Sequence, residues 1–245
     1  MSAIKTDCGI FTDAGGRPVN EDFADMLMKK GACCFVLCDG LGGHGMGDKA
    51  SRFVARFVLR EFARCTDISA FITRVLPEAQ TALRGEQARK GIAGKMKTTA
   101  VVLVLDGESA YCAHIGDSRL YRFRGGVADF RTRDHSIPQM LVMTGEIGEE
   151  QIRSHPDRNK LLRALGDDRE EIKCETVRLD LRPGDAFLLC SDGFWEPVTE
   201  DEMLALLSSC RSAKDWVSKM AALAVRNSVG SSMDNFSAVG VMVKG

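Results

Sequence analysis

The chain has 245 residues, of which 44% are hydrophobic and 27% charged, enough for a large core and a polar surface. The 33 basic and 34 acidic residues give a formal net charge of −1, which argues against non-specific binding to nucleic acid or anionic membranes. The longest apolar run, Ala32 to Cys38, is far shorter than the ~20 residues that cross a bilayer. Residues 1–7 lack a signal-like apolar stretch, and the odd number of cysteines, 9, predicts reduced thiols in a cytoplasmic protein.

The N-terminal half of the chain predicts strands followed by a pair of helices. Apolar runs and alternating patterns indicate three strands, over 4–13, 22–29 and 32–38. Apolar residues at helical spacing then indicate two amphipathic helices, over 48–65 and 68–89. A glycine-rich loop, residues 41–47, separates the third strand from the first helix.

The C-terminal half also predicts strands and a pair of helices. Asp-Gly and Gly-Gly turns separate four closely spaced strands, over 98–105, 109–115, 119–124 and 127–130. Three further strands are predicted near 172–179, 186–190 and 236–243. Two helices are predicted near 200–209 and 213–226. Because strands adjoin strands and helices come in pairs, we predict an α+β fold with antiparallel sheets and segregated helices. No linker or repeat divides the chain, so 1–245 is interpreted as a single domain.

The glycine-rich loop has three interpretations. Residues 40–45 match G-x-G-x-x-G between a strand and a helix, as in dinucleotide-binding folds. Such a fold needs a second strand ending in an acidic residue about 20 positions later, and here those positions fall inside the first helix. A phosphate-binding P-loop needs Lys where this chain has Asp48. A simple flexible turn explains the glycines but not the aspartate, Asp39, that precedes them.

Acidic residues recur where apolar runs end. Asp39-Gly40 and Asp192-Gly193 each follow such a run, Glu21-Asp22 follows a loop, and Asp234 precedes the last strand. Any one Asp-Gly pair is more often a turn than a ligand. Several converging carboxylates would repel one another unless a cation lay between them, and oxygen-only ligands favour Mg²⁺ or Mn²⁺.

Taken together, these motifs resemble the PPM-type (type 2C) metal-dependent protein serine/threonine phosphatases. Seven motifs occur in family order: Arg17-Pro18-Val19-Asn20-Glu21-Asp22, Asp39-Gly40-Leu41-Gly42-Gly43-His44, Thr98-Thr99, Gly116-Asp117-Ser118-Arg119, Asp134-His135-Ser136, Ser191-Asp192-Gly193 and Asp234-Asn235-Phe236-Ser237. The resemblance covers nearly the whole chain and implies a bacterial stand-alone catalytic domain. The implied fold is a four-layer αββα sandwich of two antiparallel sheets flanked by helix pairs.

The resemblance also implies a metal site with two Mn²⁺ or Mg²⁺ ions and a third, weaker position. Asp39 is expected to bridge both ions and the Gly40 carbonyl to bind one of them. The ligands expected for the other ion are Asp192 and Asp234. Asp117 resembles the aspartate that joins Asp192 around the third metal. Glu21 and Asp22 resemble ligands that act through water.

The implied reaction is hydrolysis of phosphoserine and phosphothreonine by a hydroxide between the two ions, without a phosphoenzyme. Arg17 is expected to grip the phosphoryl oxygens. His44 is a candidate proton donor, because Leu41 occupies the position where eukaryotic relatives carry a histidine. Lys97 replaces the family's usual glycine before Thr98-Thr99, and we expect a local effect only.

Other functions are weighed against this one. No cysteine has Arg six positions later, which excludes a cysteine-nucleophile phosphatase, and four histidines without Gly-Asn-His argue against a His/Asp metallophosphoesterase. A catalytically inactive phosphoprotein-binding relative and an enzyme acting on small phosphate esters stay open. The expected partners are phosphoproteins, including a Ser/Thr protein kinase and its targets, and the expected state is a monomer.

Residues 132–166 have mixed composition and two short helical patches. Polar stretches at 132–135 and 145–157 predict a mobile surface segment. In relatives the corresponding flap borders the metal site, so we expect this segment to tune protein-substrate specificity. His135 and His155 lie in it and are predicted to be structural, because the metal cluster already has enough oxygen donors.

Overall fold

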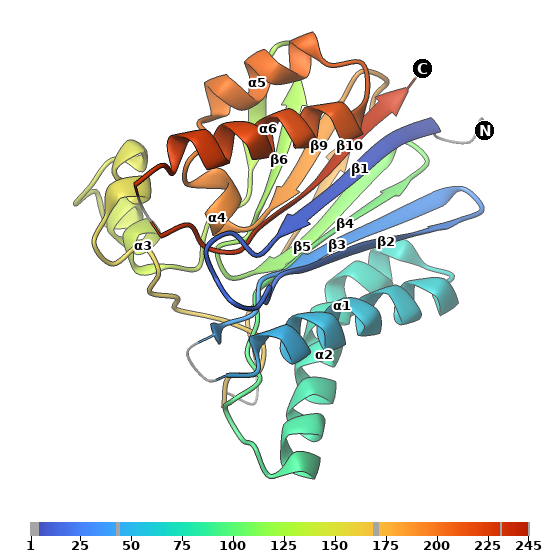
Figure 1. Ribbon diagram of the computed structural model, residues 1–245. Helices are drawn as coiled ribbons and strands as arrows, with labels where there is room; N and C mark the ends of the chain where they lie inside the picture. The colour runs from blue at the N-terminus through green and yellow to red at the C-terminus, as the bar shows by residue number, and fades with distance from the viewer. Residues whose placement is uncertain (1–4, 43–44, 169–171, 231, 245) are drawn as a thin grey trace.

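Two five-stranded antiparallel sheets, in the orders β1-β10-β9-β6-β7 and β2-β3-β4-β5-β8, form the centre of the protein (Figure 1). The computed structural model describes residues 5–42, 45–168, 172–230 and 232–244. The strands of the first sheet are β1 (Lys5–Asp13), β10 (Phe236–Lys244), β9 (Ala186–Cys190), β6 (Arg119–Arg124) and β7 (Val127–Arg131). Those of the second are β2 (Phe23–Lys29), β3 (Ala32–Cys38), β4 (Ala100–Asp106), β5 (Ser109–Ile115) and β8 (Glu175–Asp180).

Helices cover the outer face of each sheet (Figure 1). The second sheet carries α1 (Gly47–Arg64) and α2 (Ile68–Lys90). The first sheet carries α4 (Asp192–Trp195), α5 (Glu200–Ser209) and α6 (Ala213–Asn227). A peripheral segment contains α3 (Ile137–Thr144) and the 3₁₀-helix η2 (Glu149–Ser154). This arrangement confirms the predicted αββα sandwich. None of the described helices is both long and apolar enough to cross a membrane.

Three hydrophobic layers hold the four layers of secondary structure together. Alternate residues of β3 serve two of them: Phe35 and Leu37 pack between the sheets, whereas Cys34 and Val36 pack beneath α1 and α2. Because side chains alternate across a strand and both faces of this sheet are covered, every residue of β3 is buried. The sequence of β3 is therefore continuously apolar.

Most element boundaries follow the sequence prediction within a few residues, and three differences are informative. The predicted strand at 98–105 starts at β4, Ala100, because the backbone and hydroxyls of Thr98 and Thr99 bind Asp39 instead. The four-residue helix α4 was not predicted. The strand predicted near 172–179 is β8, which begins at Glu175.

The prediction that residues 132–135 belong to a mobile surface segment is wrong. Thr132, Asp134 and His135 are buried. Asp134 accepts two hydrogen bonds from the buried guanidinium of Arg119, at 2.9 and 2.7 Å. These polar residues, which the sequence analysis assigned to a solvated loop, instead form a buried network with residues 116–120, at the turn before β6 and in β6 itself.

Candidate active site

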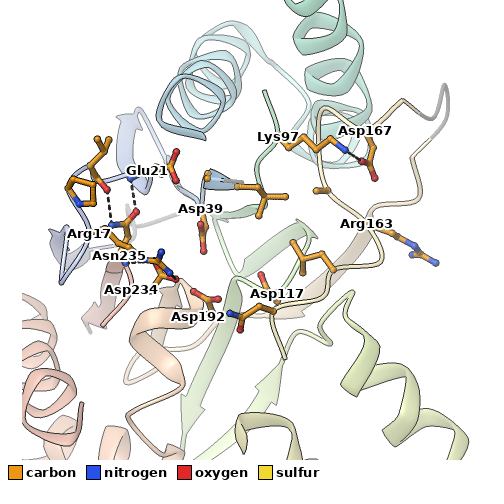
Figure 2. A pocket seen from close by; sticks show the side chains of 18 residues that line it. Arg17, Glu21, Asp39, Lys97, Asp117, Arg163, Asp167, Asp192, Asp234 and Asn235 are labelled. Carbon is orange, nitrogen blue, oxygen red and sulfur yellow. Dashed lines mark hydrogen bonds and ion pairs between the residues drawn. The ribbon is translucent and has the colours of Figure 1, made fainter. Parts of the chain in front are cut away.

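Carboxylates from both sheets meet at one end of the sandwich. Asp39 follows β3, Asp117 lies between β5 and β6, Asp192 follows β9, and Asp234 precedes β10. Because neighbouring strands are antiparallel, these strand ends fall on the same side of the molecule. The four carboxylates line one cavity of about 710 Å³ (Figure 2). The structure thus brings together aspartates that are widely separated in the sequence.

The electrostatics of the cavity are those of a cation site. Burial, followed by the charges of neighbouring carboxylates, raises the pKa of Asp39 and Asp192 well above the usual value. Burial and the charge of Asp134 raise the pKa of Asp117 to about 7. A cation between these oxygens would reverse the shifts. All the donors are oxygens, so the residues fit Mg²⁺ or Mn²⁺.

Asp22 lies beside Asp39 rather than on the cavity wall, because the following residue, Phe23, pairs with Cys38 in the β2–β3 ladder. Oδ2 of Asp22 accepts a hydrogen bond from the Ser191 hydroxyl at 2.7 Å. Its Oδ1 is buried and has no hydrogen-bond partner among the residues that the structure describes. Burial raises the pKa of this carboxyl to about 6. A buried acceptor with no donor marks a place for a water molecule or an ion.

Glu21 is held by the glycine-rich loop. The Gly47 amide donates to its Oε1 at 3.2 Å, and the Ser51 hydroxyl donates to its carbonyl at 2.5 Å. A Cβ at Gly42 would collide with the Glu21 carboxylate, and one at Gly40 would collide with the backbone of Gly47. These glycines are therefore required by close packing around Glu21. The antiparallel sheet excludes the dinucleotide-binding interpretation of the same loop.

Arg17 and Asp234 form a bidentate ion pair at the rim of the cavity (Figure 2), with nitrogen–oxygen distances of 2.8 and 3.1 Å. About half of the Arg17 side chain, 52%, is exposed. Asn235 positions the loop that carries Arg17: its side chain donates to the carbonyls of Ala14 and Val19, and it accepts from the Glu21 amide. His44 lies outside the described residues.

The backbone of Asp117 is held in place by buried residues on the side away from the cavity. The Trp195 indole donates to the Asp117 carbonyl at 3.0 Å, and the Arg119 guanidinium lies 3.3 Å from the centre of the Trp195 ring. Gly116 has φ +101°, a conformation suited to glycine, and a Cβ at this position would collide with the Thr99 side chain. The sequence motifs contained Arg119 and Asp134, but nothing in the sequence linked Trp195 to this site.

His135 forms two hydrogen bonds with the backbone of Gly116. Its amide donates to the Gly116 carbonyl at 2.9 Å, and its Nδ1 accepts from the Gly116 amide at 3.1 Å. His114, His135 and Glu175 bring three potential ligand atoms within 4.8 Å of one another. However, a neutral His135 ring whose Nδ1 accepts a hydrogen bond carries its proton on Nε2, the atom facing Glu175 at 3.4 Å. This tautomer donates to Glu175 and does not bind a metal.

Part of the cavity wall was not predicted from the sequence. The Lys97 side chain lines the cavity and pairs with Asp167 at 2.7 Å, so Lys97 contributes to the cavity and not only to the local strand. Further lining residues come from the segment expected to be a flap, among them Asn159, Leu161 and Arg163, the last of which is labelled in Figure 2. A cationic side chain at the site of an expected glycine was the available signal for Lys97. No pattern singled out the other three.

Comparisons with known proteins agree with this geometry. The profile of the protein phosphatase 2C family matches residues 15–235. Serine/threonine phosphatase stp of Listeria monocytogenes serotype 4b is 31% identical over 212 residues, which cover 83% of this chain and 84% of that protein. Serine/threonine protein phosphatase PstP of Mycobacterium tuberculosis is 31% identical over 84% of this chain and 38% of its own length.

Solved structures share the whole fold. Phosphatase Stp1 from Staphylococcus aureus superposes with a TM-score of 0.89 at 28% identity, covering 99% of this chain and 97% of that one. The catalytic domain of PstP, solved with two manganese ions, gives 0.83 at 26% identity, covering 99% and 100% of the two chains. This chain therefore belongs to the protein phosphatase 2C family. The predictions of a bacterial PPM-type protein and of a serine/threonine protein phosphatase are confirmed.

Proposed function

We propose that this chain hydrolyses phosphoserine and phosphothreonine in protein substrates by direct attack of hydroxide on phosphorus, without a phosphoenzyme. The observation that carries the proposal is the convergence of Asp39, Asp117, Asp192 and Asp234 in one cavity. Asp117 is buried and the other three are half-buried, and carboxylates that converge in this way destabilise one another unless they share a cation. The chain belongs to a metal-dependent family in which one structure contains two manganese ions.

The proposed ligands are the residues that the sequence singled out. Asp39 would contact both ions and the Gly40 carbonyl one of them, whereas Asp192 and Asp234 would hold the other. Asp117 would join Asp192 at a third, weaker site, with Glu21 and Asp22 acting through water. Two bound divalent ions, Mn²⁺ or Mg²⁺, supply a water of lowered pKa that is oriented for in-line attack.

Other residues act on the substrate itself. Arg17 would bind two phosphoryl oxygens with its planar fork, the geometry with which it now grips Asp234. His44 would donate a proton to the leaving serine or threonine oxygen. We further propose that 1–245 acts as one catalytic domain, as a cytoplasmic monomer, with a protein kinase and its targets as partners. The flap, residues 132–166, would select among protein substrates.

The test measures phosphate release by metal-stripped protein, before and after addition of Mn²⁺ or Mg²⁺. A phosphothreonine peptide, p-nitrophenyl phosphate and a small sugar phosphate are the substrates. We expect hydrolysis only with metal and a higher kcat/KM for the peptide than for the sugar phosphate. Full activity in EDTA would refute the metal mechanism, and a preference for the sugar phosphate would refute the protein substrate. His44→Ala should slow the peptide more than p-nitrophenyl phosphate, whose leaving group needs no proton.

A further inference from the structure

The solvent-facing side of α1 is strongly basic. Lys49, Arg52, Arg56 and Arg60 recur at three- and four-residue intervals, so they lie on one face of the helix. With Phe53 and Phe57 they line a shallow hollow of about 380 Å³. All four basic residues are exposed, whereas both phenylalanines are half-buried. We call this surface, residues 49, 52, 53, 56, 57 and 60, the α1 basic groove.

The positive charge of this groove is largely uncompensated. Within the part of the chain that the structure describes, Lys49, Arg52 and Arg56 have no carboxylate at ion-pair distance, and Arg60 pairs with Glu61 at 2.9 Å. Several basic side chains on other helices do have acidic partners, such as Lys219 with Asp215 on α6 and Arg89 with Glu86 on α2. The groove therefore presents at least three free cations over an aromatic floor, a surface that attracts anions.

Aromatic rings hold two of these cations in place. The Arg52 guanidinium lies 4.7 Å from the centre of the Phe23 ring, and that of Arg60 lies 5.0 Å from the ring of Phe57. Stacking of this kind restricts the side chain while leaving its N–H donors directed outward. The arginines are thus partly ordered before a ligand arrives, which lowers the entropic cost of binding.

The groove starts at the candidate active site. The first residue of α1, Gly47, donates to the Glu21 carboxylate, and Ser51 donates to the Glu21 carbonyl. Lys49 and Arg52 flank Ser51 in the first turns. From Gly47 to Arg60 the helix extends about 20 Å at 1.5 Å per residue. An extended peptide spans that length with roughly six residues.

We propose that the α1 basic groove binds an acidic segment of the protein substrate, within about two to seven residues of the phosphorylated residue. This proposal rests on the proposed phosphatase function. A membrane surface fits less well, because interfacial helices insert an apolar face. Here the apolar face of α1 is buried against the second sheet.

The test uses the full chain and two variants of equal charge. Lys49→Gln/Arg52→Gln/Arg56→Gln removes three charges from the groove. Arg211→Gln/Lys214→Gln/Arg226→Gln removes three from exposed positions at or near α6, on the opposite helical layer. The substrates are phosphothreonine peptides with acidic residues before, after or on neither side of the phosphothreonine, and p-nitrophenyl phosphate. Fluorescence anisotropy with the unphosphorylated acidic peptides measures binding separately from catalysis.

For the wild type and the α6 variant we expect kcat/KM about tenfold higher for one acidic peptide than for the neutral one at low salt. The groove variant should lose this preference and the anisotropy signal while hydrolysing p-nitrophenyl phosphate normally. Equal effects of both variants, or no preference in the wild type, would overturn the proposal. So would binding to phosphatidylserine vesicles that needs the groove when peptide binding does not. If no phosphoester is hydrolysed with Mn²⁺, the proposed function fails, and the anisotropy experiment still decides whether the groove binds acidic peptides.

Discussion

At the scale of single residues, the carboxylates that suit the cavity for binding a cation also destabilise the metal-free fold. Asp39 is half-buried among other acids, and its raised pKa means that the folded, metal-free protein resists its ionisation. Its folded-state pKa exceeds the unfolded one, so the associated stability is present at low pH and is lost as pH rises. At neutral pH, the ionised cluster therefore destabilises the metal-free fold.

Asp39→Asn tests this conflict. In EDTA at neutral pH the variant should melt several degrees above the wild type, because one of several mutually repelling, partly desolvated carboxylates is gone. With excess Mn²⁺ the order should reverse, and kcat should fall by orders of magnitude. Calorimetric melting under both conditions is the measurement.

Asp185→Asn is the matched control, because Asp185 is a buried acid that is paired with Arg124 at 2.6 Å. That variant should melt lower in EDTA and in Mn²⁺ alike and should keep its activity. An Asp39→Asn variant with wild-type kcat would show that the bridging role is misassigned.

Arg17→Ala tests the role of the arginine at the rim. A grip that is formed before reaction binds ground and transition states similarly, so KM should rise about tenfold while kcat changes little. Steady-state kinetics on the phosphothreonine peptide separate the two constants. A loss confined to kcat would mean that Arg17 acts on the transition state alone.

At the scale of elements, the segment around residues 164–168 is anchored rather than loose. Gln87 of α2 donates to the carbonyls of Met96 and Gly166, at 2.8 and 2.9 Å. The backbones of Thr98 and Leu165 exchange two hydrogen bonds. Asp167, which pairs with Lys97 at the cavity, belongs to this anchored segment. The anchor thus holds part of the cavity wall against the helical layer.

Gln87→Ala should lower the free energy of unfolding by roughly 2 kcal/mol, because two buried carbonyls lose their donor. Urea denaturation measures the change. Gln151→Ala, at an exposed glutamine of η2 that accepts one hydrogen bond from the Gly148 amide, is the control and should change stability by less than about 1 kcal/mol. Equal stabilities of the two variants would show that the anchor contributes nothing.

The rings of His114 and His135 are stacked with their centres 4.9 Å apart, and they make the stability of the fold depend on pH. Burial lowers the pKa of both, that of His135 to about 4. Their folded-state pKa lies below the unfolded one near 6.5, so the stability they contribute is complete above pH 6.5. It declines as pH falls toward 4, when the unfolded chain takes up protons first.

The His114→Gln/His135→Gln variant should therefore lose less stability than the wild type between pH 7 and pH 5, by on the order of 2 kcal/mol. Denaturation is compared at the two pH values, with excess Mn²⁺ so that the carboxylate cluster does not contribute its opposite trend. Parallel pH dependence of the two proteins would contradict the account.

Strand and helix positions were largely predictable, because continuous runs such as Ala32–Cys38 report burial on both faces of a sheet. Asp39 and Asp192 were predictable because each directly follows such a run, whereas Asp117 was identified only through the resemblance of its motif to the family. Trp195, Gln87 and Asn159 were not, because their roles come from contacts made only after folding. The burial of residues 132–135 was missed for the same reason, since composition reports polarity but not whether the partners are solvent or protein.

At the scale of the whole molecule, two stacked sheets place strand ends from distant parts of the chain around one cavity. The helical layer on the second sheet supplies Glu21 with its partners, and the other layer supplies Asp192 and Trp195. No single element holds a complete site. We propose that the assembled cavity binds two divalent cations.

Direct counting of bound Mn²⁺ tests this claim without reference to catalysis. Metal-stripped protein is titrated with Mn²⁺ in a calorimeter, and electron paramagnetic resonance of the same samples reports whether the bound ions are coupled. We expect two coupled ions per chain in the wild type and the loss of that coupled pair in Asp39→Asn. A wild type that binds no Mn²⁺, or an Asp39→Asn variant that binds the same coupled pair with unchanged affinity, would contradict it.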